Sequence, residues 1–391
     1  MNELKYFTFE HKKSGFTDQL RYFVALCRLG NFMGFSYLHT PFISLRSGLG
    51  NNEVQSPHEF IGVNAYFQRI GIEIENNLEN YHLIEIDLSN INWQSLEFNN
   101  FTKLIDFINK TIKYNSIPEV SKNKPILVYF KHYHANTKKL YRYIFENTYK
   151  HNESCDLREI YQHERSLHPR ASLFNESAIK ILIHIRQGDT SIISTPWATH
   201  IPVRSKRKDF LREYSAYEDI EAPDIFTVCE IYEFFQRFIN YFEHKNLSIL
   251  LYSDGWKRAH EIIYKNIEKL NWNNDYVQKL RAGENSYDDE QFSEFSKLGG
   301  VLLQVGEEPE KLLNLIDSVV KSDIVFCTSQ QAMMPKLVSS LCLQEKPIII
   351  VLYKEKIPKM NSIIEGRVSN RFVYVNIFNP DFKSWIQRVS C

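Results

Sequence analysis

Short apolar runs alternate along the chain with longer amphipathic stretches. The short runs have the length and β-branched composition of buried strands, whereas the longer stretches repeat apolar residues at helical spacing. Strands are predicted at 5–10, 35–39, 81–88, 125–130, 180–185, 247–252, 301–305, 324–327, 347–353 and 372–377. Helices are predicted at 20–30, 96–112, 137–165, 227–244, 256–270, 307–322, 328–341 and 381–389. This alternation predicts an α/β fold whose parallel strands are joined by right-handed crossovers.

The chain is long enough for more than one hydrophobic core. Its 391 residues exceed what a single core usually supports, so two domains are expected. The long helical connection at 137–165 ends just before Pro169. We therefore predict domains at 1–168 and 169–391. The Gly-rich stretch 46–57 in the first domain is predicted to be an irregular loop.

Composition narrows the class of protein. The chain has 47 Lys and Arg residues against 47 Asp and Glu residues, so no bulk charge favours a nucleic-acid partner. No apolar run reaches the length of a membrane span, and the first ten residues lack a signal-peptide core. The six cysteines form no CxxC pair. Buried thiols in a reducing compartment and a cytoplasmic location are expected, while peripheral association with a membrane stays open.

The stretch Lys-Ile-Leu-Ile-His-Ile-Arg-Gln-Gly-Asp-Thr at 180–190 concentrates candidate chemistry at the end of a predicted strand. In open α/β sheets, ligands bind at the carboxyl ends of the strands. Arg186 suits a phosphate because its planar fork donates two parallel hydrogen bonds, and Gly188 allows the backbone to approach a bulky anion. A local salt bridge between Arg186 and Asp189 is an equally simple interpretation.

Two further predicted strands end in polar residues. Ser253 and Asp254 follow the strand at 247–252, and Thr328-Ser329-Gln330 follows the strand at 324–327. In a parallel sheet these ends and the end that carries His184 share one edge. The hydroxyls and backbone N–H groups of 328–330, at a predicted helix start, are suited to a phosphate. A helix cap is the alternative role for these residues.

Two carboxylates are candidates for nucleoside recognition. Asp254, or Asp317 in the helix predicted at 307–322, could accept hydrogen bonds from ribose hydroxyls or a purine ring. The structural alternatives are a helix cap for Asp254 and a solvated helix residue for Asp317.

A second candidate anion site lies near the N-terminus, between the strand at 5–10 and the helix that follows it. Gly15 frees the loop, Thr17 or Asp18 can cap the helix, and exposed backbone N–H groups at a helix start attract anions. Lys12 and Lys13 would reinforce that attraction. A capping role alone also explains Asp18.

Several common site classes are not supported. The chain contains no GxxxxGK[ST] motif and no GxGxxG after a strand, so neither a P-loop nucleotidase nor a dinucleotide oxidoreductase is indicated. His132 and His134 have no third ligand nearby, and no apolar element positions Asp288 and Asp289. We therefore expect no metal site.

Four motifs together resemble the superfamily of α1,2-, α1,6- and protein O-fucosyltransferases. The run His-Ile-Arg-Gln-Gly-Asp at 184–189 resembles the HxRxGD-type motif of that family. Ser253-Asp254 is similar to its second motif, and 317–341, with Cys-Thr-Ser-Gln at 327–330, to its third. Gly-Phe-Thr-Asp-Gln-Leu at 15–20 resembles its N-terminal Gly-x-x-Asn-Gln loop. Two departures stand out: many members have Arg where Gln187 stands and Asn where Asp18 stands.

The resemblance implies a GT-B arrangement, in which two Rossmann-like domains face each other across a cleft. It implies GDP-fucose as the donor, bound mainly by the C-terminal domain, a glycan or glycoconjugate hydroxyl as the acceptor, inversion at the anomeric carbon, and no metal or other cofactor. The expectation of a cytoplasmic enzyme that builds surface polysaccharide comes instead from the lack of a recognisable signal or membrane segment in the sequence.

The resemblance also gives individual residues their expected roles. Arg186 would neutralise the departing diphosphate, with hydrogen bonds from His184 and from the hydroxyls at 328–329. Asp18 is the first candidate for the base that deprotonates the acceptor, and Asp189 is the second. The remaining expected donor contacts are Gly15, Thr17, Gln19, Gly188, Asp254, Asp317 and Gln330.

Two other functions stay open. The same fold could use a different nucleotide sugar. Gln187, which replaces an Arg of the family motif, also leaves room for a glycan- or nucleotide-binding protein without catalysis.

Overall fold

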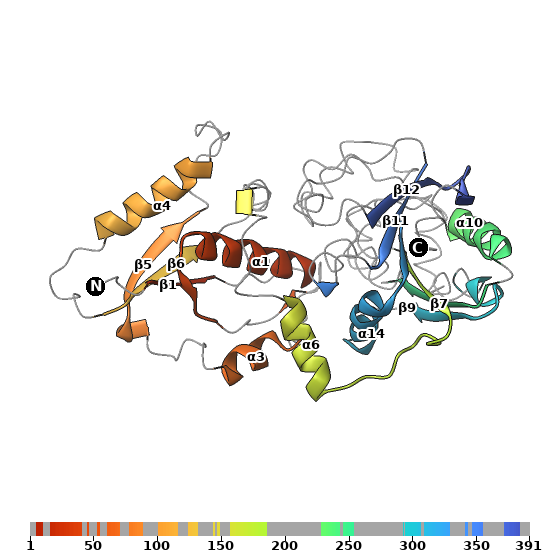
Figure 1. Cartoon of the computed structure of the whole chain (residues 1–391), viewed down its shortest axis with the longest axis horizontal. Helices are drawn as coiled ribbons and strands as arrows, with labels where there is room; N and C mark the ends of the chain where they lie inside the picture. Colours follow the sequence, from red (N-terminus) through yellow and green to blue (C-terminus); the bar gives the residue numbers. More distant parts are fainter. Residues whose placement is uncertain are drawn as a thin grey trace, which may run out of the picture. The chain divides into compact units, whose positions relative to one another are not determined.

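The computed structural model divides into two compact units, which are described separately (Figure 1). Unit 1 comprises Met1–Pro169 and Asn361–Arg367, and unit 2 comprises Arg170–Met360 and Val368–Cys391. The structure describes residues 5–10, 16–40, 45–46, 53–54, 61–70, 78–88, 101–115, 124–131, 144, 147–148, 157–185, 228–242, 245–253, 292, 294–305, 309–328, 341–342, 346–354 and 371–383.

Unit 1 is built on a four-stranded parallel sheet in the order β2-β1-β6-β5. Its strands are β1 (Lys5–Phe9), β2 (Ser36–Tyr37), β5 (His82–Asp87) and β6 (Ile126–Lys131). The helices described in this unit are α1 (Phe16–Phe32), α3 (Val63–Arg69), η1 (Leu78–Asn80), α4 (Phe101–Asn115) and α6 (Leu157–Leu167). Because all four strands are parallel, the carboxyl end of β1 lies on the same edge of the sheet as those of β2, β5 and β6.

Aromatic packing explains why α1 lies along β1. Phe9 of β1 and Phe23 of α1 meet edge to face with ring centroids 6.0 Å apart, and both are buried. The predicted helix end at Gly30 is wrong, because α1 continues to Phe32. A Cβ at Gly30 would lie 2.4 Å from the ring of Phe7, so this glycine allows close approach between helix and strand.

The prediction of an irregular loop at 46–57 is also wrong in part. β3 (Leu45–Arg46) and β4 (Glu53–Val54) pair antiparallel at the two ends of this Gly-rich stretch. Each strand has only two residues, too few for a period-two pattern to be recognised in the sequence.

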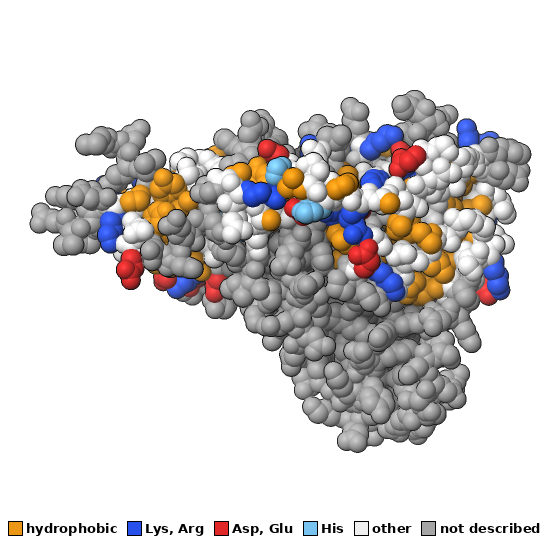
Figure 2. Space-filling model, turned by 90° about the horizontal axis from the view of Figure 1, so that it is seen from below, with side chains coloured by type: hydrophobic (Ala, Val, Ile, Leu, Met, Phe, Trp, Pro, Cys, Tyr) orange, Lys and Arg blue, Asp and Glu red, His pale blue; other side chains and the backbone are white. Residues whose placement is uncertain are grey.

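Hydrophobic side chains reach the surface in both units, as one face of the molecule shows (Figure 2). On α4 the buried residues Leu104, Ile108 and Ile112 form one stripe, whereas Phe107 and Tyr114 are exposed. This is the pattern of a helix that covers a sheet with one side only.

Unit 2 is built on a six-stranded parallel sheet in the order β12-β11-β10-β7-β8-β9. Its strands are β7 (Ile179–Ile185), β8 (Leu247–Ser253), β9 (Val301–Val305), β10 (Ile324–Cys327), β11 (Ile348–Tyr353) and β12 (Phe372–Asn376). Its described helices are α10 (Val228–Tyr241) and α14 (Pro309–Lys321). The predicted α/β class, with Rossmann-like parallel sheets in two units, is confirmed.

A cluster of phenylalanines packs α10 against one face of this sheet. Phe326 of β10 contacts Phe234, Phe235 and Phe238, with ring centroids 4.9–5.9 Å apart. Because successive strand residues point to opposite faces, the neighbours of Phe326 in sequence face away from α10. α14 also packs against β7.

Some predicted elements cannot be compared with the structure. The helix predicted at 256–270 lies outside the described residues, as do residues 329–340 of the helix predicted at 328–341. The metal candidates considered and discounted from the sequence, His132 with His134 and Asp288 with Asp289, lie outside them as well. Within the described residues, no helix is both long and apolar enough to cross a membrane.

Candidate functional site

The carboxyl ends of three neighbouring strands form the candidate site. β7 lies between β10 and β8, so the polar ends that the sequence singled out belong to adjacent strands. His184 of β7 is aligned with Cys327 of β10 and with Tyr252 of β8. Ile185 is aligned with Ser253, the last residue of β8. The sheet therefore brings the described parts of the three motifs together.

Thr328 ties the end of β10 to β7. Its backbone N–H donates to the carbonyl of His184 at 3.3 Å, and its hydroxyl lies 3.5 Å from the same oxygen. The side chain is buried, at 5% exposure. Thr328 thus holds in register the two strand ends that precede the predicted phosphate-binding residues.

His184 is buried in the sheet face beside an aromatic ring. Its imidazole is 2% exposed and is stacked on Tyr252, with centroids 5.8 Å apart and ring planes 8° apart. The alternation of side chains places both rings on the face opposite Phe326, away from α10. The imidazole therefore has a fixed plane directly beneath the carboxyl edge.

Cys327 completes this row but is not suited to nucleophilic chemistry. It is fully buried, and burial raises the pKa of its thiol. A thiol that stays protonated at neutral pH is a poor nucleophile and a poor metal ligand. Its role is packing between β7 and β11.

Asp317, which the sequence offered as a nucleoside contact, is bound to Arg170 in the structure. The carboxylate of this buried α14 residue lies 2.9 Å from Arg170 Nε. Arg170 also donates to Asn314 Oδ1 at 2.8 Å and to Glu310 at 2.5 Å. Burial works against the charge of Arg170, but Glu310 and Asp317 outweigh it and raise the pKa of the guanidinium. The structure shows Asp317 in an ion pair with Arg170, and a role in nucleoside binding stays a prediction.

The N-terminal candidates lie in the first turn of α1. Because α1 begins at Phe16, Thr17, Asp18 and Gln19 stand inside the helix, and neither Thr17 nor Asp18 precedes it as a cap would. The remaining predicted site residues lie outside the described residues: Gly15, Arg186, Gly188, Asp189, Asp254, Ser329 and Gln330.

Sequence reasoning missed a buried histidine at the carboxyl end of β2. His39 Nδ1 lies 3.0 Å from the hydroxyl of Tyr37, Nε2 lies 2.9 Å from Asn64 Oδ1, and the ring is stacked on Phe67. Burial lowers the pKa of His39 to about 4, although the bond to Asn64 opposes this. His39 is therefore neutral at neutral pH. Its partner Asn64 lies in another element, so no sequence motif indicates the pair.

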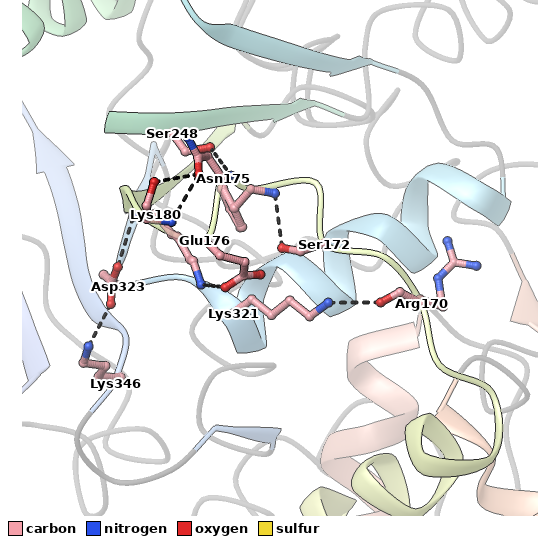
Figure 3. Close-up of polar contacts among 11 residues, drawn as sticks. Arg170, Ser172, Asn175, Glu176, Lys180, Ser248, Lys321, Asp323 and Lys346 are labelled. Atoms are coloured by element: carbon pink, nitrogen blue, oxygen red, sulfur yellow. Dashed lines mark hydrogen bonds and ion pairs between the residues drawn. The ribbon is translucent and has the colours of Figure 1, made fainter. Parts of the chain in front are cut away.

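A polar cluster at the opposite, amino edge of the unit 2 sheet was also missed (Figure 3). Asp323 Oδ2 accepts from the backbone N–H of Lys180 at 3.0 Å, and Oδ1 accepts from Lys346 Nζ at 2.8 Å. Lys180 pairs in turn with Glu176, whose pKa Lys180 and Ser172 lower. The cluster ties β10 to β7, and its charges are balanced within the unit.

Metal ligation finds no support in the part of the chain that the structure describes. No group of three or more His, Cys, Asp or Glu side chains is close enough there to bind a metal ion.

Comparisons with known proteins give no argument for the fold or the function of this chain. No protein-family model matches the chain, and no curated protein matches it. The chain is similar to the crystal structure of POFUT1 in complex with GDP, with a TM-score of 0.38 and 11% sequence identity across 95% of this chain and 98% of that chain. A likeness this weak carries no functional argument, so the fold assignment rests on the two sheets themselves.

Proposed function

We propose that the protein is an inverting glycosyltransferase that transfers fucose from GDP-fucose to a hydroxyl of a glycan or glycoconjugate. The observation that carries the proposal is the adjacency of β10, β7 and β8, whose carboxyl ends lead into three polar motifs. Open parallel sheets bind nucleotides at this edge. We choose GDP-fucose as the donor because residues 184–189 resemble the fucosyltransferase motif.

The proposed reaction is a single displacement. The acceptor oxygen bonds to the anomeric carbon on the side opposite the diphosphate, the bond to the diphosphate oxygen breaks with its electron pair, and a carboxylate takes the acceptor proton. Arg186 neutralises the charge that develops on the leaving group. Asp18 is the first candidate for the base and Asp189 the second.

Residues near the sheet edge would bind the donor. We propose that the backbone N–H groups of 329–330 and the edge of the His184 ring contact the diphosphate. The N–H of Thr328 already donates to the carbonyl of His184. Asp254 and Asp317 are the candidates for the nucleoside contact, and we prefer Asp254 because Asp317 is paired with Arg170 in the structure. No metal is required for these roles, because Arg186 supplies the positive charge.

A protein that binds a nucleotide or glycan without turnover is the second candidate. Gln187 favours it, because it removes one positive charge from a motif that commonly has two Arg residues. A donor other than GDP-fucose is a variant of the first proposal.

A nucleotide panel tests the proposal. GDP should raise the melting temperature, whereas UDP and CMP should not, because only a ligand bound by the native state stabilises it. Hydrolysis or transfer from GDP-fucose should then persist in EDTA. Equal shifts with all three nucleotides would overturn the GDP-sugar site. GDP binding without turnover of any nucleotide sugar would favour the binding protein, and a strict metal requirement would reopen the metal question.

A further inference from the structure

One row of side chains beneath the carboxyl edge of the unit 2 sheet differs from the row below it. Val325, Leu182 and Leu250 are aligned across β10, β7 and β8 on the face away from α10, and all three are buried and aliphatic. Two residues further along the three strands, the aligned residues on the same face are Cys327, His184 and Tyr252. Polar chemistry therefore begins inside the core, one row before the strand ends.

The two rings in this row are arranged with little freedom. The His184 and Tyr252 rings are nearly parallel, 8° apart, at a centroid distance of 5.8 Å typical of offset stacking. They are 2% and 4% exposed. A ring whose face is covered in this way can make polar contacts only through its edge, where the imidazole nitrogens lie.

The backbone of His184 is held as well. His184 is aligned with Tyr252 in β8 and with Cys327 in β10, and the carbonyl of His184 accepts a hydrogen bond from the N–H of Thr328. With the backbone fixed by its neighbours, the orientation of the imidazole depends on what packs against the ring. The ring of Tyr252 is one of the groups that pack against this imidazole.

We propose that Tyr252 is a positioning residue of the donor site. It holds the His184 ring so that an edge nitrogen is directed toward the diphosphate before the donor arrives. Preorganisation of this kind raises affinity, because the side-chain freedom that binding would otherwise remove has already been lost in the free protein. This inference rests on the proposed function, in which His184 contacts the donor.

The aromatic ring of Tyr252 is what the role requires. Leucine fills the equivalent position one row below, at Leu250, so the core alone does not require an aromatic side chain in β8. A flat ring stacked at 8° fixes the plane of its neighbour, whereas a leucine would pack against it without fixing it. Tyr252→Phe should therefore preserve the function, and Tyr252→Leu should not.

A double-mutant cycle on GDP affinity, measured by titration calorimetry, tests the inference. Tyr252→Leu should weaken GDP binding by about two- to tenfold, the scale of aromatic pair energies. The same change in a His184→Ala background should have no further effect, because Tyr252 acts through His184. Tyr252→Phe should bind as the wild type does. Leu251→Ala, on the opposite face of β8, is the control for lost core packing and should leave the affinity of the folded protein unchanged.

Each contrary outcome has a distinct meaning. Equal weakening in both backgrounds, or a Phe variant as weak as the Leu variant, would overturn the positioning role. Absence of GDP binding by the wild type would refute the proposed function instead.

The stack itself is checked without ligand by the NMR chemical shift of the His184 ring protons, which are assigned by their loss in His184→Ala. That shift should move in Tyr252→Leu and stay in Tyr252→Phe, and an unmoved shift in the Leu variant would overturn the inference.

Discussion

The two edges of the unit 2 sheet differ in how their polar groups are satisfied. At the amino edge, Asp323 meets Lys346 and the backbone of Lys180, so charge is balanced by charge (Figure 3). At the carboxyl edge, His184, Ser253 and Thr328 are buried, and the N–H and the hydroxyl of Thr328 approach the backbone carbonyl of His184. We therefore expect the charged groups of the amino edge to hold the sheet together, and the carboxyl edge, with the motifs that follow it, to carry ligand binding.

The two edges should therefore respond differently to mutation. Changes at the amino edge should lower the stability of the protein and leave ligand binding intact. Changes at the carboxyl edge should alter ligand binding or turnover by more than they alter stability.

Arg186→Lys should reduce transfer from GDP-fucose by about two orders of magnitude, the scale of losing one transition-state donor. Lysine keeps the charge but cannot form the bidentate contact with a phosphate. The matched control is the same substitution at Arg170, which should lower the melting temperature and spare turnover. Steady-state kinetics with the two variants measure the contrast, and near-normal transfer by the Arg186→Lys variant would contradict the assignment.

His39 is a useful exception, because it lies at the carboxyl end of β2 yet is satisfied within unit 1. Its pKa is lowered from 6.5 to about 4, so the unfolded chain takes up a proton in this range before the folded chain does. Stability should therefore be complete above pH 6.5 and fall as the pH drops toward 4, by on the order of 3 kcal/mol.

Urea unfolding at pH 7 and pH 4.5 measures this loss. His39→Gln should remove most of the pH dependence in this window, whereas His168→Gln, at an exposed position next to α6, should retain it. An unchanged pH dependence in His39→Gln would show that another group is responsible.

Asp317→Asn distinguishes the two roles offered for this carboxylate. Loss of the charge opposite Arg170 should destabilise unit 2 by about 2 kcal/mol, less than for a fully buried pair because Arg170 is partly exposed. The GDP affinity of the folded protein should not change. Glu310→Gln removes an exposed partner of the same Arg170 and should have a smaller effect. A tenfold loss of GDP affinity in Asp317→Asn would instead establish the nucleoside contact.

The sequence was sufficient for elements whose signal is local. The strands β9 and β10 were predicted with their observed bounds, because each is a short, mostly apolar run. Gly30 was misread because a glycine inside a helix and a glycine after one look alike without Phe7 in view. The partner of Asp317 is Arg170, far away in the chain, so the pairing could not be predicted. The same holds for His39 and Asn64.

Lys346→Met should have the smallest effect of these substitutions on the free energy of unfolding. Lys346 is 72% exposed and Asp323 is 28% exposed, so the pair should contribute under about 1 kcal/mol. Burial opposes ionisation of Asp323, but the N–H of Lys180 and the ammonium of Lys346 together lower its pKa below 3.8. A lowered carboxylate pKa stabilises the fold at pH values above the pKa of the unfolded state. This contribution disappears as the pH falls through the pKa of the folded state.

Wild type and variant should therefore have the same stability in strong acid, and also in about 1 M salt, which screens exposed pairs. Chemical denaturation across pH and salt measures this convergence, and GDP affinity should be equal in the two proteins throughout. A GDP affinity that changed with Lys346 would show that the amino edge communicates with the donor site, and the division between the two edges would fail.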